Sequence, residues 1–168
     1  IQKKENFLKF LNYFLSKYEV SIKGIKKRES LFHARHSARK REYRYIIINR
    51  PASLSLEKNR AWHVRKKLNI KSMKKGANIL KGRHDFSSYR ASSCTAKSPI
   101  KNLEKIKITK NADRIMIVFT SRSFLQQQVR SMVGCLKYLG EEKWNLKKFN
   151  EVLVLKKRVN CAPPAPPM

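Results

Sequence analysis

Apolar side chains near the start of the chain recur at the spacing of a helix. They are Phe7, Leu8, Phe10, Leu11, Phe14 and Leu15. This spacing predicts an amphipathic helix over residues 4–17, with one apolar stripe. Three further apolar residues, Val20, Ile22 and Ile25, follow closely and favour a short strand after the helix.

The middle of the chain predicts one strand and two helices. Residues 43–49 (YRYIIIN) are a run of β-branched and aromatic side chains that ends shortly before Pro51, which is typical of a strand. The patterns of residues 59–68 and 72–81 are both helical, and Gly82 is well placed to end the second of these helices.

The second half predicts a hairpin and two more helices. Alternating apolar residues flank the turn sequence at residues 111–113 (NAD), which indicates a β-hairpin. An apolar stripe predicts a long helix over residues 125–139 that Gly140 stops, and a last helix spans residues 146–155 with Asn145 as its N-cap. The fold class that we predict is therefore α+β, a mostly antiparallel sheet with helices packed on one face.

Composition points to one domain with a polyanionic partner. The 168 residues suffice for one domain with a hydrophobic core, and because no linker or repeat divides them, we expect a single domain over residues 1–168. The 40 Lys and Arg residues outnumber the 11 Asp and Glu residues, which leaves a formal net charge of +29. Such a surplus favours nucleic acid as the partner. An AT-rich genome, which enriches Lys, would explain part of the surplus without any such function.

Several other kinds of site lack the residues they need. The apolar stretches are far shorter than the roughly 20 residues of a membrane-spanning helix. Cys94, Cys135 and Cys161 are an odd set without close spacing, which argues against a disulfide framework or a zinc site and favours a reducing cytoplasm. His33 and His36 have no flanking metal ligands, so we expect no metal site.

Four segments are dense in polar and aromatic residues. They are residues 32–39 with 41–45 (FHARHSAR, REYRY), 82–91 (GRHDFSSYRA), 94–100 (CTAKSPI) and 122–134 (RSFLQQQVRSMVG). In this order they resemble the TruA family of tRNA pseudouridine synthases, whose patterns there are close to FHARFSA..R.YRY, G.HDFSSFRAS.C, SP.R.I and RSFLHHQVRNMVG. The resemblance covers nearly the whole chain, from about residue 11 to residue 166.

The resemblance implies an enzyme that isomerises uridine in tRNA to its C-glycoside, pseudouridine. In this family an aspartate initiates the reaction, and no cofactor is consumed. Tyr43 matches the family tyrosine that stacks on the target base and is a candidate to assist proton removal from C5; without the resemblance it would be interpreted as a tyrosine in the core. Arg130 matches the arginine that pairs with the aspartate and would keep a desolvated carboxylate ionised, the alternative being an exposed helix arginine.

The resemblance also implies RNA contacts. The residues concerned are His84, Asp85, Arg90 and Lys97 near the active cleft, and Arg35, Arg39, Lys40 and Arg41 in the first basic segment. The implied substrate is the tRNA anticodon stem-loop, with uridines at positions 38–40, and the implied assembly is a homodimer. RNA of this form is bound mostly through its backbone, which suits a broad basic surface.

The sequence departs from the family at the catalytic aspartate. The family aspartate lies in a G-R-T-D-x-G-V-H-A segment upstream of FHAR, and neither Asp85 nor Asp113 matches it. We therefore expect an incomplete, inactive part of the enzyme, the C-terminal domain without the N-terminal domain and the closing C-terminal strand. Residues 126–128 (QQQ) also replace a histidine pair, and Ser131 replaces an asparagine. The alternatives are a non-catalytic basic RNA-binding protein derived from the same domain and a decaying gene fragment without a stable fold.

Overall fold

The computed structural model describes residues 2–167 of the chain. Where the sequence suggested one continuous domain, the chain divides into two compact units, Ile1–Ala38 and Arg39–Met168. The second unit contains the sheet and most of the residues predicted for the site. No helix in the part of the chain that the structure describes is long and apolar enough to cross a membrane.

The first unit is built around one helix. The helix predicted over residues 4–17 is confirmed as α1 (Gln2–Leu15). The strand predicted at residues 20–25 is wrong, because the backbone of Ile22 bonds to a side chain of α1 instead of to another strand. Its N–H donates to Oδ1 of Asn12 (2.7 Å), and its carbonyl accepts from Nδ2 of the same residue (2.9 Å).

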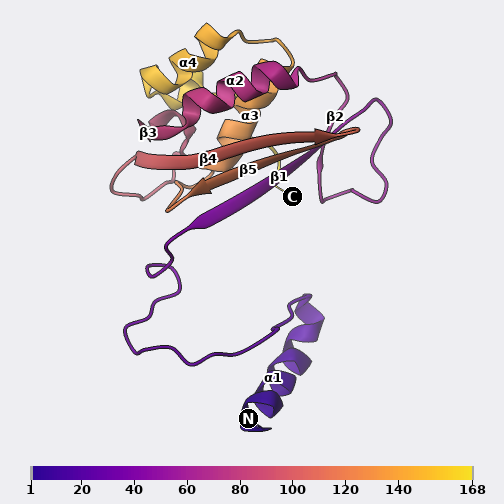
Figure 1. Cartoon of the computed structure of the whole chain (residues 1–168), viewed down its shortest axis with the longest axis vertical. Coiled ribbons are helices and arrows are strands. Elements are labelled where there is room, and N and C mark those ends of the chain that lie inside the picture. The colour runs from indigo at the N-terminus through magenta and orange to yellow at the C-terminus, as the bar shows by residue number, and fades with distance from the viewer. Residues whose placement is uncertain (1, 168) are drawn as a thin grey trace. The chain divides into compact units, whose positions relative to one another are not determined.

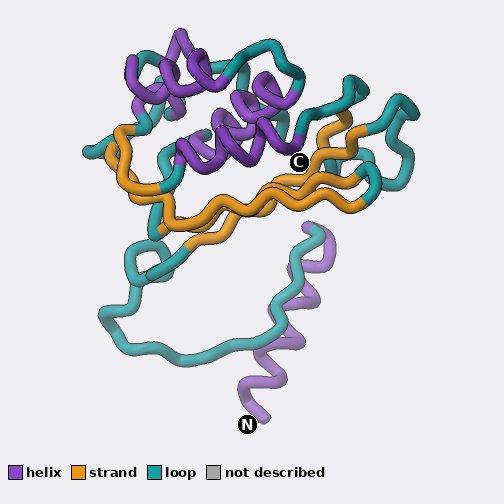
Figure 2. Tube along the Cα trace, turned by 45° about the horizontal axis from the view of Figure 1, so that its top comes forward, coloured by secondary structure: helices purple, strands orange, loops and turns teal. Residues whose placement is uncertain are grey.

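The second unit is a five-stranded sheet with helices packed on one face (Figures 1 and 2). Its elements within residues 39–167 are β1 (Arg41–Asn49), β2 (Trp62–Val64), α2 (Ile70–Leu80), β3 (Gly82–Asp85), η2 (Ser87–Tyr89), β4 (Ile100–Asn111), β5 (Arg114–Ser121), α3 (Gln128–Gly140), α4 (Leu146–Leu155) and η3 (Arg158–Asn160), where η marks a 3₁₀ helix. The strand order is β2-β1-β5-β4-β3, and only the β1–β2 pair is parallel among these strands. The predicted α+β class is confirmed.

The core lies between this sheet and the helices. Side chains alternate between the two faces of a strand, and the buried apolar residues of one face of β1, β4 and β5 lie beneath the helices. One row runs across the sheet from Tyr45 through Ile117 to Ile108. Met132 and Leu136 of α3 belong to the same buried cluster as this row. Burial of these large apolar groups is the main stabilising contribution to the unit.

Most elements of the second unit follow the predicted pattern. The β4–β5 hairpin, α2 and α4 are confirmed, and Asn145 caps α4 by accepting the N–H of Lys148 at 2.8 Å. The long helix is confirmed as α3, but it begins three residues later than residue 125. Gln127 has a left-handed φ of 60°, and the N–H of Leu125 donates to Oε1 of Gln128 at 2.8 Å. A turn therefore occupies the residues expected to be the first turn of the helix.

The helix predicted over residues 59–68 is wrong. This segment holds β2 and an extended stretch that is fixed by Asn49 at the end of β1. The side-chain amide of Asn49 donates to the carbonyls of Val64 and Lys66 (2.8 Å each), and its oxygen accepts the N–H of Leu68 (3.0 Å). These bonds to a distant side chain override the local helical pattern. The short strand β3 was not predicted either, because its four residues are of mixed polarity.

Candidate active site

Tyr43 lies on β1, on the face of the sheet that the helices cover. It shares this face with Tyr45, two residues further along, but its side chain is 49% exposed whereas that of Tyr45 is 5% exposed. The ring of Tyr43 meets the ring of Phe124 edge to face, with centroids 5.1 Å apart. Phe124 thus supports one edge of the Tyr43 ring, and the exposed part of the ring offers a surface on which a base can stack.

Arg130 lies in the first turn of α3 and is partly buried. Its Nε donates to the carbonyl of Ala165 at 2.6 Å, and the N–H of Ala165 donates back to the carbonyl of Arg130 at 3.0 Å. Among the residues that the structure describes, no carboxylate pairs with this guanidinium. Arg130 is therefore held in place through Nε while its charge has no acidic partner within residues 2–167.

The proline-rich segment (residues 162–167) packs against both α3 and β1. The hydroxyl of Tyr45 donates to the carbonyl of Pro166 at 2.8 Å. Burial raises the pKa of Tyr45, and the positive charge of Arg130 opposes this only in part, so the hydroxyl keeps its proton. Gly134 allows the close approach, because a Cβ there would overlap the carbonyl oxygen of Pro163.

Asp85 and His84 stabilise the end of β3. The carboxylate of Asp85 accepts the N–H and the hydroxyl of Ser87, at 2.9 and 2.6 Å. Burial would raise the pKa of Asp85, but these two bonds and the charges of Lys156 and Arg90 outweigh it and lower the pKa. Nε2 of His84 bonds to the carbonyl of Lys81 at 2.7 Å.

The strand order separates these residues from Tyr43. Since β5 and β4 lie between β1 and β3, the two strands are roughly 14 Å apart at the usual spacing. Tyr45 and Arg130 bond to neighbouring carbonyls of the proline-rich segment, and Tyr43 lies two residues before Tyr45 on the same face of β1. His84 and Asp85 lie on β3, an edge strand of the sheet.

The remaining predicted residues lie in loops and in the lead to β1. Arg39 and Lys40 are exposed and directly precede β1, whereas Nη1 of Arg41 donates to the carbonyl of Arg122 at 2.5 Å. Arg90 is partly buried after η2, and Lys97 is exposed in the loop before β4. Arg35 belongs to the first unit.

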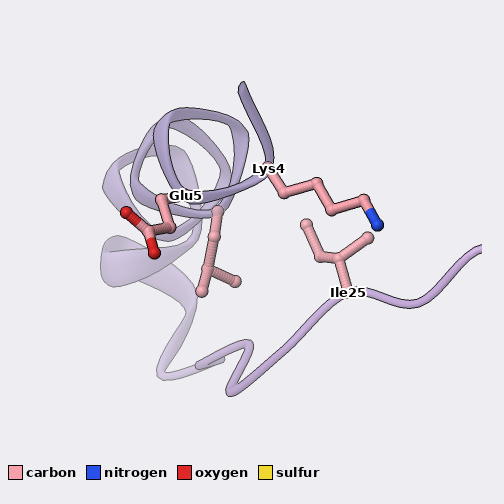
Figure 3. Close-up of a pocket in the computed structure, with 4 residues that line it drawn as sticks. Lys4, Glu5 and Ile25 are labelled. Carbon is pink, nitrogen blue, oxygen red and sulfur yellow. The ribbon is translucent and has the colours of Figure 1, made fainter. Parts of the chain in front are cut away.

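Two other features are separate from this region. A surface hollow of the first unit is lined by Lys4, Glu5, Leu8 and Ile25 and contains none of the predicted site residues (Figure 3). Among the described residues, no group of three or more His, Cys, Asp or Glu side chains could hold a metal ion.

Sequence reasoning missed Tyr45 and the proline-rich segment. The signal for Tyr45 was present, because the period of a strand places the second tyrosine of R-x-Y-x-Y on the same face as Tyr43. The contact of Arg130 with Ala165 carries no such local signal. It joins residues that are far apart in the chain and meet only in the folded unit.

Comparison with known proteins gives a consistent picture. A family profile described as tRNA pseudouridine synthase matches residues 77–168. The chain is 57% identical to tRNA pseudouridine synthase A of Pelagibacter ubique over 166 residues, which are 99% of this chain and 68% of the relative. It is 42% identical to the protein of the same name from Parvibaculum lavamentivorans (94% of this chain, 64% of the relative) and 44% identical to that from Paramagnetospirillum magneticum (93% and 61%). The chain thus spans about two thirds of the length of these relatives. With its motifs, its fold and these relatives in agreement, the chain belongs to the tRNA pseudouridine synthase family.

Proposed function

We propose that this chain is part of an enzyme that isomerises uridine to pseudouridine in the anticodon arm of tRNA, at positions 38–40, and that it contributes Arg130 to the active site. The observation that carries the proposal is the state of Arg130. This guanidinium is partly buried and oriented through Nε, and it lacks an acidic partner among the described residues. Partial burial of a cation without a counter-charge costs free energy, and pairing with a catalytic aspartate would offset that cost.

The aspartate itself is supplied by residues outside these 168. Both aspartates of the chain already have structural partners. Asp85 accepts two hydrogen bonds from Ser87 in the turn after β3. Asp113 lies in the β4–β5 turn and pairs with Arg50, with Nη1 and Oδ2 2.9 Å apart. Neither carboxylate contacts Arg130, which supports the view that the nucleophile comes from elsewhere.

Tyr43 receives the target uridine in this proposal. Its partly exposed ring would stack on the base, and edge-to-face contact with Phe124 would hold the ring in a fixed orientation. The phenolic oxygen would then lie near the base and could assist removal of the proton from C5. Tyr45, which is buried and keeps its proton, instead serves to hold the proline-rich segment that orients Arg130.

Binding of the tRNA is proposed to rest on basic residues around β1 and the neighbouring loops. Arg39 and Lys40 are exposed where the chain enters β1, next to Tyr43, and are well placed to contact phosphates. Lys97 and Arg90 would extend the contact surface. The roles of Arg35, Arg41, His84 and Asp85 in RNA binding, and the homodimer, stay predictions.

A non-catalytic RNA-binding protein is the second candidate function. The large positive charge favours it equally well, and it would need no aspartate. The two candidates differ in what they require of Arg130. In an enzyme this residue matters for the reaction, whereas a binding protein would use it only as one more positive charge.

The 168 residues on their own are expected to form no pseudouridine, since no carboxylate within residues 2–167 pairs with Arg130. The purified chain should be incubated with an unmodified tRNA transcript that contains the target uridines, and pseudouridine should be assayed by site-specific chemical detection. An intact tRNA pseudouridine synthase A serves as the positive control. Site-specific formation above background would mean that Asp85, Asp113 or another group acts as nucleophile.

A further inference from the structure

Two cysteines that are distant in sequence meet in the second unit. Cys135 lies on α3 and is fully buried, and Cys161 follows η3 and is partly buried. Their sulfur atoms are 3.3 Å apart, and both thiols are free. A disulfide bond has an S–S length of about 2.05 Å, so a small shift of either side chain would bring the sulfurs to bonding distance. The spacing of the cysteines in the chain does not indicate this pairing.

The surroundings distinguish the two thiols. The hydrogen bond between the two thiols lowers the pKa of Cys161, and with the nearby guanidinium of Arg158 it outweighs the effect of burial, which raises this pKa. The same bond and burial raise the pKa of Cys135. Arg158 is itself held by Ser131, whose Oγ accepts from Nη1 at 3.0 Å. The phenol of Tyr89, the other titratable group here, stays neutral because burial raises its pKa.

We propose that Cys135 and Cys161 are a redox-sensitive pair whose oxidation to a disulfide fixes the proline-rich segment to α3. The oxidant is a small disulfide such as oxidised glutathione. The thiolate of Cys161, the more accessible and more acidic sulfur, attacks one glutathione sulfur and releases the first glutathione thiolate, which leaves a mixed disulfide. The Cys135 thiol then loses its proton to solvent and attacks the sulfur of Cys161, which releases the second glutathione thiolate. Two protein thiols are thereby oxidised and one glutathione disulfide is reduced to two thiols.

The disulfide would restrain the proline-rich segment, which holds Arg130 in the candidate active site. Cys161 directly precedes the proline-rich segment, and the carbonyl of Ala165 in this segment orients Arg130. A covalent bond from Cys161 to α3 would restrain the start of the segment and would limit the movement of Ala165 away from Arg130. This consequence for the active site rests on the proposed function, whereas formation of the disulfide does not.

The test uses the purified chain and no activity assay, so its outcome is independent of the proposed function. The chain is treated with oxidised glutathione, free thiols are alkylated, and the digest is analysed by mass spectrometry. We expect a linked peptide pair that contains Cys135 and Cys161, with Cys94 alkylated. We also expect the melting temperature to rise by about 6 to 12 °C, because the bond closes a loop of intermediate length. Dithiothreitol should reverse both changes.

Matched variants identify the sulfurs involved. Cys161→Ala should abolish the linked peptide and the rise in melting temperature, and Cys94→Ala should leave both unchanged. Cys135→Ala, which keeps an apolar group in the core, should retain glutathione on Cys161 without progress to a disulfide; its circular dichroism reports whether it is folded. The proposal is overturned if the wild-type chain links Cys94, stops at the mixed disulfide, forms only intermolecular bonds, or links Cys135 to Cys161 without a rise in melting temperature.

Discussion

The affinity of the chain for tRNA is expected to fall by roughly 10²- to 10⁴-fold when monovalent salt rises from about 50 to about 200 mM. Each phosphate that a basic residue neutralises releases condensed counterion, so log affinity falls linearly with log salt at about −0.7 to −0.9 per contact. Only one face of a compact unit can meet an anticodon arm. We therefore expect about five to eight phosphate contacts, which involve a minority of the 40 basic residues.

Paired variants test which basic residues make these contacts. The double substitution Arg39→Gln, Lys40→Gln should make the slope shallower by about 1.4 to 1.8. The matched control Lys74→Gln, Lys75→Gln removes the same charge from exposed positions of α2 and should leave the slope unchanged. Arg130→Ala should hardly alter it. Fluorescence anisotropy over a salt series measures all three, and an affinity insensitive to salt, or binding abolished by Arg130→Ala alone, would contradict the assignment.

Adding one methyl group at Gly134 is expected to lower the free energy of unfolding by about 1 to 3 kcal/mol. A Cβ at this position would overlap the carbonyl oxygen of Pro163, and backbone atoms, unlike a flexible side chain, cannot simply rotate away. Either α3 or the proline-rich segment must shift. The higher helix propensity of Ala acts in the opposite direction by roughly 1 kcal/mol, so the overlap is expected to dominate.

Urea denaturation of Gly134→Ala provides the measurement. Gly24→Ala is a suitable control, because a Cβ there would meet no atom within 4 Å, and its effect should stay within about 0.5 kcal/mol. If Gly134→Ala were as stable as the wild type or more stable, helix propensity would outweigh the contact. The proline-rich segment would then not be packed against α3 in the way that orients Arg130.

The elements that were predicted correctly carry their signal locally. The stripe of α1, the β-branched run of β1, the hairpin turn before Arg114 and the N-cap Asn145 can each be recognised within one short window. The segment of residues 59–68 shows the limit of this reasoning. Its apolar spacing is helical, but the side chain of Asn49 binds its backbone from the end of β1, and no window that contains only the segment can reveal that.

In the candidate site, too, residues within local motifs could be predicted, whereas contacts between distant residues could not. Tyr43 and Arg130 could be named from motifs, and the half-exposed ring of Tyr43 and the partly buried position of Arg130 are compatible with the predicted roles. The contacts that hold Arg130 in place could not be predicted, because Arg130 and Ala165 are 35 residues apart in the chain and Tyr45 and Pro166 are 121 residues apart. The contact between Cys135 and Cys161 was missed for the same reason, since spacing in sequence says nothing about a pairing that the packing of α3 and η3 creates.

A chimeric enzyme tests the central proposal most directly. The part of Pelagibacter ubique tRNA pseudouridine synthase A that matches this chain, 68% of that protein, is replaced by the chain, so that the rest of the relative remains in place. We expect the chimera to form pseudouridine in the anticodon arm of a tRNA transcript. Arg130→Ala in the chimera should lower kcat by at least about 100-fold with little change in tRNA affinity, because a partner of the catalytic carboxylate is lost. A chimera that folds and binds tRNA but forms no pseudouridine, or one whose kcat is unaffected by Arg130→Ala, would contradict the proposal.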